Sequence, residues 1–143
     1  MPPTAKENVI VGVGIDLMES SRVAREIARG GWPSEDGVFT PGEIAYCGAG
    51  KRAAQRYGAC FAGKEATLKA LGAAVADSGT FREVEVKFES GTQYQIVLHN
   101  RLLAIAKHLG VRHINLSIAA TRKCIGAMVI MESRTPDADR THV

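Results

Sequence analysis

Two cations and a carboxylate lie close together near the middle of this chain, and they are the residues best suited to chemistry. Lys64 belongs to a stripe of residues at helical spacing, made up of Tyr57, Phe61, Lys64, Leu68 and Leu71. Glu65 and Lys69 are four residues apart and therefore stand on one flank of that stripe. Two ammonium groups and a carboxylate beside one apolar surface could form a wall for a ligand that carries phosphates and a divalent metal ion.

A structural explanation of the same residues is also available. A lysine in a core-facing stripe must either extend its ammonium to water or meet a negative partner, because burying an unpaired charge is prohibitive. Lys64 would then lay its methylenes along the edge of the core, while Glu65 and Lys69 would form a solvated helix pair. Spacing alone leaves both explanations open.

Asp16 is a second candidate carboxylate, on a predicted strand over residues 9–17. The odd positions of this strand are all apolar, whereas Gly12, Gly14 and Asp16 share the opposite face. Glycines beside a lone carboxylate allow a backbone or a ligand to approach closely. Alternatively, the glycines admit a packed helix, and Asp16 or Ser20 caps the helix that follows. Gly12 and Gly14 form no dinucleotide-binding motif, because the third glycine is missing.

Composition restricts the class of protein. The chain has 143 residues, 45% of them hydrophobic and 23% charged, which is typical of one globular domain. No apolar run is long enough to span a membrane, and no signal peptide is evident, so we expect a cytoplasmic protein without a membrane partner. A net charge of +3 is too small to indicate nucleic acid. Cys47, Cys60 and Cys124 lack metal-ligand spacing and are expected to be free thiols.

A basic ridge is predicted on the helix expected over residues 19–29. Arg22, Arg25 and Arg29 recur at helical spacing on one face, without an acidic residue on that line. Such a ridge is either an ordinary solvated face or a surface that docks an acidic partner.

The remaining pattern predicts an α+β domain, a mainly antiparallel sheet packed against a long central helix. Thr40 and Glu43 form a capping box that opens a short helix through Cys47, and the central helix runs from about Lys51 to Leu71, ending at Gly72. Further elements are a loop at 76–80, a hairpin at 84–98, a helix capped by Asn100 and strands at 113–120 and 124–132. Residues 124–132 are apolar on both faces and are predicted to lie inside the sheet. Residues 1–8 form an expected extension, 9–133 the domain and 134–143 a frayed tail.

Three segments together resemble the holo-acyl-carrier-protein synthases, the small 4′-phosphopantetheinyl transferases. These segments are Gly14-Ile15-Asp16-Leu17-Met18-Glu19-Ser20-Ser21-Arg22, Phe39-Thr40-Pro41-Gly42-Glu43-Ile44-Ala45-Tyr46-Cys47 and Phe61-Ala62-Gly63-Lys64-Glu65-Ala66-Thr67-Leu68-Lys69-Ala70-Leu71-Gly72. Each segment alone is weak evidence, but all three occur in order with suitable spacing. The resemblance covers roughly residues 9–133.

The resemblance implies a magnesium-dependent transfer of phosphopantetheine from coenzyme A to a serine of an apo acyl carrier protein, with release of 3′,5′-ADP. Asp16 and Glu65 would hold Mg²⁺, an ion usually bound by one or two carboxylates plus substrate phosphates. Lys64 and Lys69 would offset phosphate charge, and the general base would be Glu65 or a metal-bound water that it orients. The coenzyme A contacts implied by the resemblance are Lys64, Lys69, Gly72, Ser117, Thr121 and Arg122.

The resemblance also implies partners. The basic ridge of Arg22, Arg25 and Arg29 matches the helix with which the family meets its acidic carrier, and family members of this length are usually trimers with sites between subunits.

The chain departs from the family pattern at several positions. The family's Ser-x-Ser-His-Thr is replaced here by Ser117-Ile118-Ala119-Ala120-Thr121, which removes a hydroxyl and an imidazole. Losing one polar contact would weaken coenzyme A binding by about 1 to 3 kcal/mol. Cys60 stands where the family often has Arg, and Gln93-Tyr94 replaces a Pro. An alternative function is therefore a catalytically weakened or inactive subunit that binds carrier proteins.

Overall fold

The computed structural model describes residues 8–34, 37–72, 78–89 and 93–133. The elements in chain order are β1 (Val9–Glu19), α1 (Ser20–Ala28), α2 (Pro41–Cys47), α3 (Ala53–Leu71), α4 (Ser78–Arg82), β2 (Val84–Phe88), β3 (Tyr94–Leu98), α5 (Asn100–His108), β4 (His113–Ala120) and β5 (Cys124–Ser133). Residues 1–7 of the predicted extension over 1–8, and the whole predicted tail over 134–143, lie outside the described residues. Within the described part of the chain, no helix is long and apolar enough to cross a membrane.

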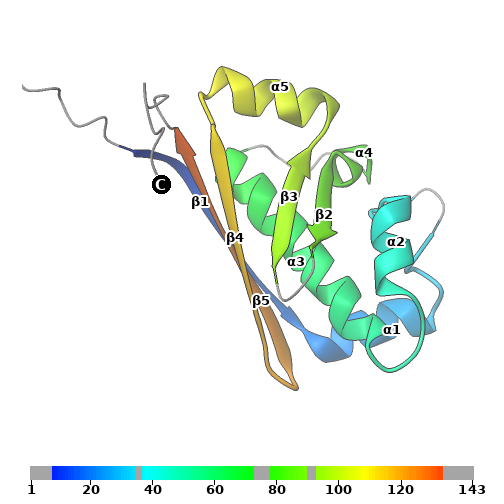
Figure 1. Ribbon diagram of the computed structural model, residues 1–143. Coiled ribbons are helices and arrows are strands. Elements are labelled where there is room, and N and C mark those ends of the chain that lie inside the picture. Colours follow the sequence, from blue (N-terminus) through cyan, green and yellow to red (C-terminus); the bar gives the residue numbers. More distant parts are fainter. Residues whose placement is uncertain (1–7, 35–36, 73–77, 90–92, 134–143) are drawn as a thin grey trace, which may run out of the picture.

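Two antiparallel sheets pack around one central helix. β1, β5 and β4 form a three-stranded sheet with β5 in the middle, and β2 and β3 form a separate hairpin. Figure 1 shows α3 running between this sheet and the hairpin, with α2 beside the hairpin. The predicted α+β class is confirmed, as is the position of β5 inside the sheet, where it pairs with β1 on one side and β4 on the other.

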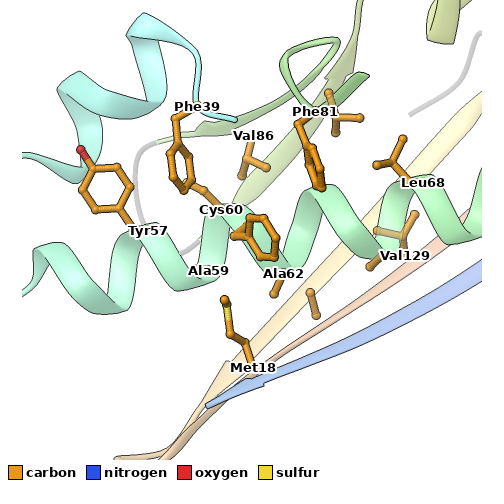
Figure 2. Close-up of a cluster of buried hydrophobic side chains, with 14 of the residues drawn as sticks. Met18, Phe39, Tyr57, Ala59, Cys60, Ala62, Leu68, Phe81, Val86 and Val129 are labelled. Carbon is orange, nitrogen blue, oxygen red and sulfur yellow. The ribbon is translucent and has the colours of Figure 1, made fainter. Parts of the chain in front are cut away.

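α3 is buried on nearly all of its surface. Of its 19 residues, 14 are buried, because the sheet covers one side and α2 with the hairpin covers the other. Figure 2 shows Phe39, Phe81 and Val86 on one side of the helix and Met18 and Val129 on the sheet side. Because elements pack on both sides of it, α3 is the element around which the core forms.

Helix ends were predicted with mixed success. The capping box is present, since Glu43 N donates to Thr40 Oγ1 at 3.2 Å and Thr40 N donates to Glu43 Oε1 at 2.8 Å. Gly72 ends α3 with φ of 72°, in the left-handed region that glycine adopts without strain. The predicted cap at Asn100 is wrong, because Asn100 is the first residue of α5 and His99 precedes it in an extended conformation.

One element was missed. The segment predicted as a loop over residues 76–80 contains the start of α4, a five-residue helix. Its signal is weak because Gly79 and Thr80 are poor helix formers. Tertiary packing favours the helix instead, since the ring of Phe81 stacks on Phe61 of α3 at a centroid distance of 5.4 Å.

Candidate active site

Asp16 and Lys69 form an ion pair between β1 and α3. Lys69 Nζ lies 3.1 Å from Asp16 Oδ1 and also donates a hydrogen bond to the carbonyl of Ile15 at 3.0 Å. The Asp16 side chain is 16% exposed and that of Lys69 is 52% exposed, so the pair opens to solvent on the lysine side. Asp16 is therefore not a helix cap, as one of the sequence interpretations proposed, but a partner of α3.

Glu65 belongs to the same neighbourhood. Burial raises the pKa of the Glu65 carboxyl group, and the charge of Asp16 raises it further, whereas Lys69 and Arg22 act in the opposite direction. Charges shift a pKa appreciably only at close range. The fold therefore gathers two carboxylates, one ammonium and one guanidinium where α3, β1 and α1 meet.

The two carboxylates have donor chemistry that fits a magnesium ion. Mg²⁺ in nucleotide sites is typically held by one or two carboxylates, with substrate phosphates and water completing the shell. Within the described residues, no group of three or more His, Cys, Asp or Glu side chains could hold a metal by itself. Because the pKa of Glu65 is raised partly by the charge of Asp16, a divalent cation would relieve their repulsion. The residues present fit an ion that needs a phosphate ligand as well.

Lys64 does not lie where a phosphate contact was predicted. Its side chain is 0% exposed, and its Nζ pairs with Glu43 Oε1 at 2.7 Å. Nζ also donates to the carbonyls of Phe81, at 2.9 Å, and Val84. An ammonium has three hydrogens, so its donors are all engaged inside the protein. The expectation that Lys64 offsets phosphate charge is therefore wrong. The sequence required its ammonium either to reach water or to meet a negative partner, and it meets Glu43.

Glu43 completes this buried network. Besides binding Lys64, its carboxylate accepts hydrogen bonds from the backbone N–H groups of Thr40 and Val86, both at 2.8 Å. The network ties α2, α3 and β2 together. One turn away on the same two helices, Cys47 Sγ and Cys60 Sγ are 3.9 Å apart, and both are free thiols as predicted.

A polar hollow lies at the turn between β4 and β5. Its volume is about 480 Å³, and its lining consists of Ser20, Lys51, Ala54, Gln55, Ala120, Thr121 and Arg122. Thr121 Oγ1 accepts hydrogen bonds from the N–H groups of Lys123 and Cys124, which holds the turn in place. Two cations and several polar groups around one hollow suit an anionic ligand. Thr121 and Arg122 were predicted site residues, whereas Lys51 and Gln55 were missed.

Ser117 and Gly72 lie elsewhere in the subunit. Ser117 is exposed on β4 and lines a groove of about 1010 Å³ between β3, α5 and β4, separate from the hollow that contains Thr121. Gly72 is the exposed end of α3, three residues beyond Lys69. Within one subunit, the predicted coenzyme A contacts are therefore divided between different surfaces.

The predicted basic ridge is only partly a row of free cations. Arg22 and Arg25 are exposed on α1, and Arg22 faces the Glu65 neighbourhood. Arg29 is paired with Glu26, with contacts of 2.6 and 2.7 Å from Nη2 to the two carboxylate oxygens. Glu26 lies four residues after Arg22 and three before Arg29, so it stands on the same face of α1 as the arginines, and it was overlooked at the level of sequence.

The chain is similar to known proteins over most of its length. The family model described as "4′-phosphopantetheinyl transferase superfamily" matches residues 12–125. A holo-acyl-carrier-protein synthase from Koribacter versatilis is 37% identical over 124 residues, which is 87% of this chain and 99% of that protein.

Solved structures also align over most of the chain. The acyl carrier protein synthase of Mycobacterium tuberculosis is 29% identical with a TM-score of 0.63, over 87% of this chain and 99% of that one. The holo-(acyl-carrier-protein) synthase of Bacillus anthracis, in complex with coenzyme A (3′,5′-ADP), gives a TM-score of 0.69 at 24% identity, over 87% of this chain and 97% of that one.

Proposed function

Because this chain belongs to the 4′-phosphopantetheinyl transferase superfamily, and within it to the holo-acyl-carrier-protein synthases, we propose that it transfers 4′-phosphopantetheine from coenzyme A to a serine of an apo acyl carrier protein. The serine oxygen forms a bond to the β-phosphorus of coenzyme A. The bond between that phosphorus and the bridging oxygen of the diphosphate breaks, and 3′,5′-ADP leaves with the electron pair. The serine proton passes to a base of the enzyme.

The base in this proposal is Glu65 or a metal-bound water that it orients. In the protein without the ion, burial and the charge of Asp16 raise the pKa of Glu65. Lys69, which donates hydrogen bonds to Ile15 and Asp16 of β1, would stabilise the charge that develops on the leaving diphosphate. Phosphoryl transfer depends mainly on such positioning and charge stabilisation.

Asp16 and Glu65 are the residues that would hold Mg²⁺. When bound, the ion neutralises phosphate charge and polarises the reacting phosphoryl group. Lys69 occupies one oxygen of Asp16, so it would share this carboxylate with the ion. The protein supplies few ligands, which makes binding of the ion dependent on the diphosphate of the substrate.

The hollow at the β4–β5 turn is the proposed anchor for a phosphate of coenzyme A. Lys51 and Arg122 provide positive charge there, and Thr121 and Gln55 provide hydrogen-bonding groups. Ala120 lines this hollow where the family usually has a histidine, so we expect a weaker grip on coenzyme A than the family pattern provides. Lys51 and Arg122 offset part of that loss.

The active enzyme is proposed to be a homotrimer with sites shared between neighbouring subunits. Val13, Ile15 and Leu17 of β1 and Met128 of β5 form an exposed apolar face, with Leu17 71% exposed. Contiguous exposed apolar surface usually marks an interaction site. Ile15 and Leu17 alternate with Asp16 and therefore lie on the opposite face of the sheet. Because β1 is an edge strand of that sheet, a subunit covering this face could extend around the edge towards the proposed catalytic carboxylates. Such a neighbour could bring Ser117 or the basic hollow to them.

The observation that carries this proposal is the convergence of Asp16, Glu65 and Lys69 from distant parts of the chain. Incubation with coenzyme A, Mg²⁺ and an apo acyl carrier protein should add the mass of phosphopantetheine to the carrier. Asp16→Asn should abolish the mass gain while the protein remains folded by circular dichroism. If the wild-type protein binds apo carriers but modifies none of them, the alternative of a non-catalytic carrier-binding subunit is favoured.

A further inference from the structure

β1 and α3 approach each other more closely than any side chain would permit. A Cβ atom added to Gly14 would lie 1.8 Å from the carbonyl oxygen of Ala66, and one added to Gly12 would lie 2.0 Å from the carbonyl oxygen of Ala70. Both obstacles are backbone atoms of a buried helix, which cannot move aside as the end of a flexible side chain can. The contact therefore requires glycine at both positions.

The two contacts lie beside the catalytic residues on both elements. Gly14 is two residues before Asp16 on the same face of β1, and its contact, Ala66, directly follows Glu65. Gly12 similarly meets Ala70, which directly follows Lys69. A larger residue at Gly14 would have to separate β1 from α3 by roughly an ångström or more before ordinary contact was restored. Asp16 would then move away from Glu65 and Lys69.

We propose that Gly14 is a positioning residue of this enzyme, whose missing side chain sets the distance between the carboxylates of Asp16 and Glu65 and thereby the affinity for the divalent cation. This inference rests on the proposed function. It assigns to the glycine a role that secondary structure alone does not require, because β1 is a regular strand that other residues could form at this point.

The test measures Mn²⁺ binding, in the presence of saturating coenzyme A, from the electron paramagnetic resonance signal of the free ion. Gly14→Ala should weaken Mn²⁺ binding by about 10- to 100-fold, the range seen when groups that orient metal ligands are changed. Turnover on the apo carrier should fall by about 100-fold, which a displacement of about 1 Å can cause. Unchanged Mn²⁺ affinity in a folded Gly14→Ala protein would overturn the inference.

Gly58→Ala is the matched control. Gly58 lies on α3 and, like Gly14, packs closely against its neighbours. A Cβ atom added to Gly58 would meet Ile125 Cδ1 at 2.3 Å and Val23 Cγ2 at 3.2 Å. Gly58 is seven residues before Glu65, and its neighbours are side chains that can shift. Gly58→Ala should lower the thermal unfolding temperature without changing Mn²⁺ affinity. An equal loss of Mn²⁺ affinity in this control would show that general loosening, and not the position of Asp16, is responsible.

A rescue variant separates positioning from damage to the fold. Asp16→Glu adds one methylene, which should crowd the native site and weaken Mn²⁺ binding. In the Gly14→Ala background the longer side chain should span the widened gap, so the double variant should bind Mn²⁺ more tightly than Gly14→Ala alone. Failure of this rescue would count against the inference. If Gly14→Ala does not fold, Gly12→Ala, paired with the same rescue, provides the measurement.

Mn²⁺ binding to the wild-type protein separates a failure of the proposed metal site from a failure of the role proposed for Gly14. If it binds no Mn²⁺ with coenzyme A present, the metal site of the proposed function is wrong, and the role of Gly14 falls with it. If it binds Mn²⁺ and loses the ion on Asp16→Asn, the metal site stands, and the glycine variants alone decide the inference.

Discussion

Glu43 and Lys64 form a buried ion pair whose every polar atom is used by the protein. Such pairs add little net stability compared with apolar residues, but removing one partner leaves an uncompensated charge in the interior. Burial lowers the pKa of Lys64, while Glu43 counteracts that effect. The pair therefore fixes the relative position of α2 and α3 but adds little to the free energy of unfolding.

Replacing Lys64 should be costly. We expect Lys64→Met to reduce the free energy of unfolding by about 3 to 5 kcal/mol, because Glu43 would remain buried without its partner. Chemical denaturation followed by circular dichroism measures this difference. Lys107→Met, on the exposed surface of α5, should change it by less than about 0.5 kcal/mol. Similar stability in the two variants would show that Lys64 is not in the buried position described.

Removing the charge of Glu65 should raise stability, whereas removing the charge of Lys64 should lower it. Its pKa is raised in the folded state, so the folded protein binds more protons than the unfolded chain above the unfolded pKa, and its stability falls as the pH rises through the folded pKa. Glu65→Gln removes this penalty. Without divalent cations, its unfolding temperature should exceed that of the wild type at pH 8, with a smaller difference at pH 4.

The turnover of Glu65→Gln complements its unfolding temperature. Glu65→Gln should be nearly inactive on the apo carrier despite its higher unfolding temperature at pH 8, since the proposed base and metal ligand is lost. Glu89→Gln, an exposed position on the hairpin, should alter neither property. A Glu65→Gln protein that is less stable than the wild type at pH 8 would contradict the assigned origin of the pKa shift.

At the scale of elements, α1 connects the site to the surface that is proposed to receive the carrier. Arg22 influences Glu65 from this helix, while Arg25 is exposed on it and Arg29 is bound to Glu26. Complementary charge on such a helix mainly governs the encounter with an acidic protein. Arg25 is therefore the most informative of the three arginines.

Reversal of charge at Arg25 should weaken carrier recognition specifically. We expect Arg25→Glu to raise the KM for the apo carrier by at least about 10-fold and to leave the KM for coenzyme A unchanged, because like charges would face each other at the docking surface. Steady-state kinetics with each substrate varied in turn separates the two constants. Arg112→Glu, an equally exposed change before β4, should leave both unchanged. Equal effects at Arg25 and Arg112 would indicate only a general response to net charge.

At the scale of the whole molecule, the three-stranded sheet has one face covered by α3, whereas its other face is exposed and is apolar along β1. Val13, Ile15 and Leu17 lie on the exposed face, opposite the glycines that contact the helix. A sheet that is apolar on both faces is expected only where both are covered. A second copy of the chain is the covering that the proposed trimer provides.

Disrupting this face should disassemble the enzyme. Leu17→Glu places a charge in the centre of the proposed interface, and sedimentation velocity should show a monomer in place of the trimer, with loss of turnover. Leu109→Glu changes another exposed leucine, 43% exposed at the end of α5, and should leave assembly intact. A wild-type protein that sediments as a monomer at working concentration would refute the trimer.

The sequence by itself determined the family and most of the elements, with α4 as an exception, because both depend on local signals. The helical stripe of α3, the capping box at Thr40 and the alternation in β2 and β3 are short-range patterns, and the three motifs that resemble the transferases are contiguous. For the same reason the sequence left two interpretations of Asp16 open, a carboxylate where a backbone or ligand approaches closely, or a helix cap beside glycines that admit a packed helix. Helix packing against Gly12 and Gly14 was correct, and helix capping by Asp16 was wrong.

The tertiary structure alone decided which charges lie at the proposed site and which lie in the core. Lys64 and Glu65 are adjacent in sequence, yet a helix turns successive side chains by about 100°, and here one enters the buried network while the other faces Asp16. The partner of Lys64, Glu43, is 21 residues away on another helix. Lys51 and Arg122, which line the same hollow, are also distant in the chain. Long-range packing sets these proximities, and no local pattern encodes them.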